Sequence, residues 1–109
     1  MSYQIKSGGS IEKDIPLSDY KIILEIADNA CNYLKEKKAI LVTGPGELCK
    51  ETITTRNNED YWVYHLDNTT LFYGTKPVRV GLEKLIRITF TTVGMNSKQI
   101  LSDLKNILK

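Results

Sequence analysis

The stretch from Cys49 to Tyr73 limits the fold of this chain more than any other part of its sequence. It contains three runs rich in β-branched and aromatic residues: CKETITTR, EDYWVYHL and TTLFYGT. The polar dipeptides Asn57-Asn58 and Asp67-Asn68 separate these runs. Because Asn and Asp tolerate the positive φ of a two-residue hairpin turn, this arrangement predicts three consecutive antiparallel strands.

Helical patterns lie on both sides of these strands. From Leu17 to Lys37, directly behind Pro16, apolar residues recur at three- and four-residue spacing, which predicts a long helix. The shorter segment from Ser97 to Leu108 shows the same spacing. Asn96 is a suitable N-cap for this second helix, and Gln99, three residues later, completes the pattern of a capping box.

Turn residues and alternation predict the rest of the chain. We expect residues 1–14 to be flexible or to form a short edge strand, with Tyr3–Lys6 extended and Ser7–Ser10 as a flexible joint. The apolar run Ala39–Thr43 is expected to be a buried strand that leads into the meander.

Beyond the meander, Gly74–Pro77 is expected to form a turn, because Pro cannot donate a hydrogen bond to a sheet. Val78–Val80 is then a short edge strand, and the alternation in Leu85–Val93 predicts a half-buried strand. We therefore expect one α+β domain over residues 1–109. Its five-stranded antiparallel meander would carry a long N-terminal helix and a C-terminal helix on one face.

Charge argues against a protein dedicated to duplex nucleic acid, because 15 Lys and Arg stand against 13 Asp and Glu in 109 residues. The balance is uneven along the chain, however. Residues 1–54 carry seven basic and eight acidic residues, whereas residues 55–109 carry eight and five. Much of the basic surplus falls between Lys76 and Arg87.

The sequence offers no recognisable catalytic, cofactor or metal site. His65 is the one histidine, and no close Cys pair or carboxylate cluster accompanies it, although such companions are what metal binding and general-base catalysis need. The segment that begins at Gly44-Pro45-Gly46 has Cys49 and Glu51 where a phosphate-binding loop needs its second glycine and a hydroxyl residue. We therefore expect a protein without a cofactor or metal that is not an enzyme, and a ligand pocket or active site near His65 is the last alternative.

The two cysteines, Cys31 and Cys49, lie far apart in the sequence and are expected to be buried free thiols. The longest apolar runs are too short to cross a bilayer, and the first residues do not form the apolar core of a signal peptide. These features predict a cytoplasmic protein without a membrane partner.

Aromatic and apolar residues occupy both faces of the expected sheet. In its middle strand Trp62 alternates with Tyr61 and Val63, and a two-layer domain leaves one sheet face exposed. The sequence does not decide which face this is. The first helix also has a second apolar stripe. We therefore predict a binding or regulatory module that contacts a protein partner, a second copy above all, through a surface drawn from Ile22, Ile26, Tyr33, Tyr61 and Val63.

A nucleic-acid-binding regulator is the leading alternative. Exposed aromatic rings can stack on the bases of a single strand, while nearby cations contact its phosphates. The residues that would make these contacts are Tyr61, Lys76, Arg79, Lys84 and Arg87.

Overall fold

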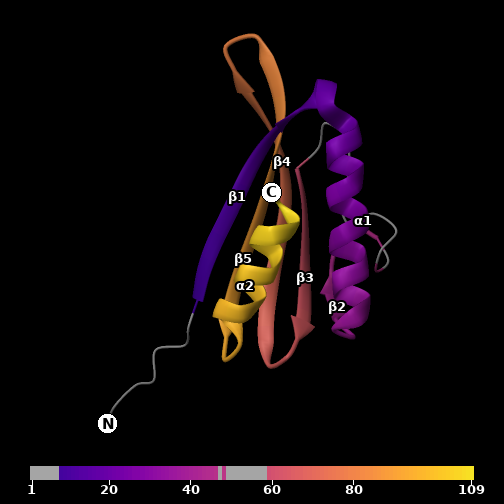
Figure 1. Ribbon diagram of the computed structural model, residues 1–109, viewed down its shortest axis with the longest axis vertical. Helices are drawn as coiled ribbons and strands as arrows, with labels where there is room; N and C mark the ends of the chain where they lie inside the picture. Colours follow the sequence, from indigo (N-terminus) through magenta and orange to yellow (C-terminus); the bar gives the residue numbers. More distant parts are fainter. Residues whose placement is uncertain (1–7, 47, 49–58) are drawn as a thin grey trace.

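The computed structural model describes residues 8–46, 48 and 59–109. Five strands form one antiparallel sheet of order β1-β5-β4-β3-β2. In chain order the elements are β1 (Gly8–Pro16), a short 3-10 turn (Leu17–Asp19), α1 (Tyr20–Glu36), β2 (Ile40–Thr43), β3 (Asp60–Leu66), β4 (Thr69–Val80), β5 (Glu83–Gly94) and α2 (Ser97–Ile107). Both helices pack on the same face of the sheet (Figure 1). The predicted α+β class is confirmed.

Local sequence signals located the middle of the sheet correctly. Asp67 and Asn68 have φ values of 47° and 57°, so they form the expected two-residue turn between β3 and β4. The predicted strand CKETITTR and the Asn57-Asn58 turn lie outside the described residues.

The predicted turn at Gly74–Pro77 is wrong, because β4 runs without interruption from Thr69 to Val80. The pairing between β3 and β4 ends at Asp60 and Thr75, so the segment of β4 beyond this point has only β5 as a neighbour. Pro77 is tolerated there because its missing N–H faces no second strand. Residues 78–84 then form a hairpin arm that extends beyond the rest of the sheet (Figure 1).

Both edges of the sheet also differ from expectation. Gly8–Ser10, predicted to be part of a flexible joint, belongs to β1, which pairs with β5 from Gly8↔Val93 to Pro16↔Leu85. Tyr3–Lys6 lies outside the described residues. Among the described residues, strand β2 lies at the edge of the sheet and is not a buried strand, and Ile40 is 67% exposed. Position in the sheet, which local sequence does not encode, determines the burial of these strands.

The predicted capping box of α2 does not form. The Asn96 side chain donates to the Asp67 carbonyl oxygen at 2.6 Å, and Gln99 donates to the Asp103 carboxylate at 2.9 Å. Asn96 therefore ties α2 to the β3–β4 turn instead of capping its own helix.

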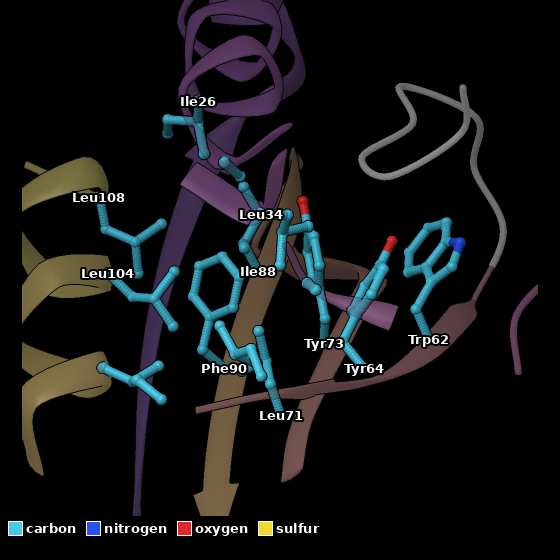
Figure 2. Packing of buried hydrophobic residues seen from close by; sticks show 14 of the residues in the cluster. Ile26, Leu34, Trp62, Tyr64, Leu71, Tyr73, Ile88, Phe90, Leu104 and Leu108 are labelled. Atoms are coloured by element: carbon cyan, nitrogen blue, oxygen red, sulfur yellow. The ribbon is translucent and has the colours of Figure 1, made fainter. Parts of the chain in front are cut away.

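The core lies between the helices and one face of the sheet (Figure 2). Its centre is a row of aromatic rings, in which Trp62 lies 5.2 Å from Tyr73 and Tyr73 lies 4.6 Å from Phe90, measured between ring centroids. Leu34 of α1 and Leu104 of α2 pack in the same cluster. Trp62, Tyr73 and Phe90 therefore mark the covered face.

The structure contradicts the prediction of a free thiol at Cys31, because this half-buried residue of α1 is disulfide-bonded. The other cysteine, Cys49, lies outside the described residues. Since disulfides are rare in the reducing cytoplasm, the cysteines no longer favour that compartment, and the localisation stays a prediction.

Candidate protein interface on the open face of the sheet

The face of the sheet opposite the helices is covered by neither of them and is called the open face here. Strand register determines its composition, because side chains that alternate with core residues point to this side. Its members include Ser10, Glu12 and Asp14 from β1, Arg87, Thr89, Thr91 and Val93 from β5, Thr70, Phe72, Gly74 and Lys76 from β4, Tyr61, Val63 and His65 from β3, and Ile40 from β2.

One half of the open face is apolar. The rings of Tyr61 and Phe72 stack with centroids 6.2 Å apart and an angle of 25° between their planes. Val63 is the cross-strand partner of Phe72 and is only 8% exposed, whereas Tyr61 is 52% exposed. Ile40 of β2 extends this surface. Tyr61, Val63, Phe72 and Ile40 form what we call the aromatic patch.

The other half of the open face is polar, and its side chains are small, so its surface is low. Gly74 stands opposite both Tyr61 and Thr89, and Thr91 stands opposite both Phe72 and Ser10. The hydroxyl oxygens of Ser10 and Thr91 are 3.0 Å apart and share a hydrogen bond. We call Ser10, Gly74, Thr89 and Thr91 the threonine strip. It lies directly beside the aromatic patch.

Folding does not require glycine at position 74. Among the described residues, a Cβ atom there would meet only the Asp60 carbonyl oxygen, at 3.8 Å, which is an ordinary contact. Glycine in a strand interior costs roughly 0.5–1 kcal/mol relative to alanine. Gly74 therefore keeps the surface beside Tyr61 low at a cost in stability, which is a feature expected of a binding surface.

One cation of the open face, Arg87, is already engaged. Arg87 donates to both carboxylate oxygens of Asp14, at 2.8 and 3.1 Å, and Glu12 lies 3.9 Å away. The hydrogen bond from Arg87 lowers the pKa of Asp14, and the same bond raises the pKa of Arg87. Asp14 and Glu12 thus offset the positive charge of Arg87.

The structure separates the other residues predicted for nucleic-acid contact. Lys76 lies on the open face opposite Arg87, while Arg79 and Lys84 face each other across the hairpin arm. With Pro77 and Val78, these two residues line a small hollow of about 160 Å³. Arg79 and Lys84 are therefore in the hairpin arm, whereas Lys76 shares the open face with the aromatic patch.

The predicted stripe on α1 does not form one surface either. Ile26 belongs to the core at 2% exposure, whereas Ile22 is exposed. Tyr33 packs against the core, and its hydroxyl donates to the Asp103 carboxylate at 2.7 Å. Burial of the ring is the main cause that raises the Tyr33 pKa well above its ordinary value, and the hydrogen bond to Asp103 raises it further. Tyr33 therefore joins α1 to α2 within one molecule.

His65 is exposed on the open face, where its Nδ1 lies 3.2 Å from the Thr70 hydroxyl. It lines neither the hollow at the hairpin arm nor the one formed by Ile11, Lys13 and Leu108. No cluster of three or more His, Cys, Asp or Glu side chains suited to a metal occurs within residues 8–46, 48 and 59–109.

Sequence reasoning proposed Tyr61 and Val63 but did not select Phe72, Gly74 or Ile40. Strand alternation alone places Tyr61 and Val63 on one face. The other three required the register of β3 against β4 and β2, which the Asp67-Asn68 turn could have provided for Phe72 and Gly74.

No protein-family model matches this chain, and neither the curated proteins nor the solved structures contain a significant match to it. In the part of the chain that the structure describes, no helix has the length and apolar character needed to cross a membrane.

Proposed function

We propose that this protein is a non-enzymatic interaction module that forms a homodimer through the open face of its sheet. The observation that carries the proposal is the stacked pair Tyr61 and Phe72 on a face that neither helix covers. An exposed face of a two-layer domain is normally polar. Large apolar side chains on such a face are a feature of protein interfaces.

A second copy suits this face because the surface is self-complementary. The raised aromatic patch lies beside the low threonine strip, and a two-fold axis between them would place each patch of one copy on the strip of the other. Gly74 would then receive an aromatic side chain of the second copy without steric conflict. The dimer would therefore bury the contact between an aromatic patch and a threonine strip twice, once on each side of the axis.

Charge favours a protein partner over nucleic acid. Arg87 is paired with Asp14, and Glu12 adds a further negative charge at the same edge. Carboxylates repel phosphates, so this half of the open face is unsuited to a nucleic-acid backbone.

The test is the mass in solution, measured by light scattering over a wide range of protein concentration at low and high salt. We expect a dimer that persists at high salt, because apolar burial is not screened. Gly74→Thr should weaken the dimer by about tenfold, equivalent to about 1.4 kcal/mol. It should not lower the stability of the monomer, because the strand gains a residue of higher β-propensity.

Matched variants locate the interface. Tyr61→Ser should dissociate the dimer, whereas Ile22→Ser, which removes a comparably exposed apolar residue from α1, should leave it intact. A strict monomer, or a dimer lost only in Ile22→Ser, would contradict the proposal. Tight binding of a single-stranded oligonucleotide that weakens steeply with salt and depends on Arg79 and Lys84 would favour the nucleic-acid alternative instead.

A further inference from the structure

A groove lies between β1 and the last turn of α2, on the helix-covered side of the sheet. It measures about 380 Å³, and its apolar residues are Ile11 of β1 and Leu108, which follows α2. Lys13, Lys105 and Lys109 also line it, against one acidic residue, Glu12. The groove therefore combines apolar side chains with a positive rim.

Lys13 fixes part of this rim. Its side-chain nitrogen donates to the Leu108 carbonyl oxygen at 2.5 Å, so the strand and the end of the helix are held together. Lys13 stands opposite Ile88 in the register, which places it on the side of the sheet that carries the helices. The positive charge is thus held at the groove and does not extend freely into solvent.

Strand β1 is also an edge of the sheet. Among the described residues it pairs with β5 alone, over nine residues, so a second strand could be added on its other side. Exposed edges of this kind are common sites for an extended peptide, whose backbone pairs with the edge while alternate side chains enter pockets.

We propose that β1 and this groove bind an extended acidic segment of another protein, which adds to the sheet as a sixth strand. Its acidic side chains pair with Lys13, Lys105 and Lys109, and its apolar side chains cover Ile11 and Leu108. The groove lies on the opposite side of the sheet from the open face and shares only Glu12 with it, and the proposal does not depend on the dimer.

Charge disfavours a second copy of β1 in the registers centred on its charged residues. In an antiparallel pair, directly opposite residues share a face. Pairing β1 with itself about Glu12 or Asp14 places identical carboxylates opposite each other, and pairing about Lys13 places two ammonium groups together. An acidic strand from a different sequence avoids these repulsions and matches the positive rim.

The probe is a fluorescein-labelled eight-residue peptide, Glu-Ser-Val-Ser-Glu-Ser-Val-Ser, in which Glu and Val share one face of the strand, compared with the same peptide carrying Lys in place of Glu. Fluorescence anisotropy should show that the full-length protein binds the Glu peptide at least about tenfold more tightly. Amide hydrogen exchange should slow in β1 when the Glu peptide is bound, because new backbone hydrogen bonds form at that edge. The absence of binding, or protection confined to the hairpin arm, would overturn the proposal.

Charge reversal provides the decisive variant. Lys105→Glu/Lys109→Glu changes two exposed residues of the rim, so it should preserve the fold while shifting the preference to the Lys peptide. Lys21→Glu/Lys98→Glu makes the same charge change in the first turns of the two helices, where acidic residues are favoured, and should leave the preference unchanged. If both double variants behave alike, net charge and not the groove determines binding, and the proposal fails.

A third variant separates this proposal from the dimer. Tyr61→Ser, which should dissociate the homodimer, should leave affinity for the Glu peptide unchanged. A loss of peptide binding in Tyr61→Ser would place the peptide on the open face and contradict the groove.

Discussion

The two faces of the sheet have similar residue types but different surroundings. On the covered face, Trp62, Tyr73 and Phe90 are almost completely buried. On the open face, Tyr61 and Phe72 come from two of the same strands, yet water still reaches them. Aromatic content alone therefore does not separate a core from an interface. Their surroundings bury one set and leave the other partly exposed.

The largest expected effect compares one phenyl ring from each face. Phe90→Ala should destabilise the fold by about 3–5 kcal/mol, because it leaves a cavity in the core. Phe72→Ala should cost less than half as much, since its ring is only partly removed from water. Urea unfolding at concentrations where the protein is monomeric measures both values.

Equal losses in the two variants would mean that the open face contributes to stability as the core does. The distinction between a structural face and a binding face would then be wrong.

A second comparison uses two glycines. Gly44 lies against the indole of Trp62, and a Cβ at position 44 would overlap this buried ring. Gly44→Ala should therefore destabilise the fold by about 1–3 kcal/mol. Gly74→Ala, on the open face, should instead stabilise it by roughly 0.5–1 kcal/mol.

Thermal unfolding of the two variants beside the parent protein measures the difference in sign. A loss of stability in Gly74→Ala would show that the fold itself needs glycine there, and Gly74 would no longer support an interface.

The smallest expected effect concerns the ion pair at the edge of the open face. Because the folded-state pKa of Asp14 is lowered, its pairing with Arg87 stabilises the fold above the ordinary pKa of 3.8. This contribution is lost as pH falls through the lowered pKa. The melting temperature of Asp14→Asn should therefore fall less than that of the parent between neutral pH and about pH 2.

Asp28→Asn, which changes an exposed carboxylate on α1, is the matched control and should follow the parent. An Asp14→Asn variant that follows the parent equally closely would show that the pair contributes nothing measurable in solution.

The sequence predicted the elements whose signals are local. Strand alternation identified β3 and most of β5, helical spacing identified α1 and α2, and the Asp67-Asn68 turn determined how β3 and β4 meet. Pro77 suggested a turn, because proline cannot donate a hydrogen bond within a sheet. The strand tolerates Pro77 because β3 ends at Asp60, which is a property of the assembled sheet. Local sequence carries no information of that kind.

The candidate site was predicted only in part for the same reason. Tyr61 and Val63 share a face by alternation, whatever lies beside them. Ile26 was assigned to a surface because one helix face seemed sufficient for the core, but this residue is part of the core cluster. The partner of Arg87 is Asp14, which is 73 residues away in the sequence. The sequence therefore did not show that Asp14 offsets the charge with which Arg87 was predicted to contact phosphate.

The pairing of β1 with β5 has a consequence for how the chain folds. Gly8 pairs with Val93, so an early strand cannot take its place until a strand near the other end of the chain is available. Contacts between such distant residues close long loops and slow folding. During synthesis, β1 must wait until β5 has left the ribosome. We therefore expect the hairpins of β3, β4 and β5 to form first and β1 to close the sheet.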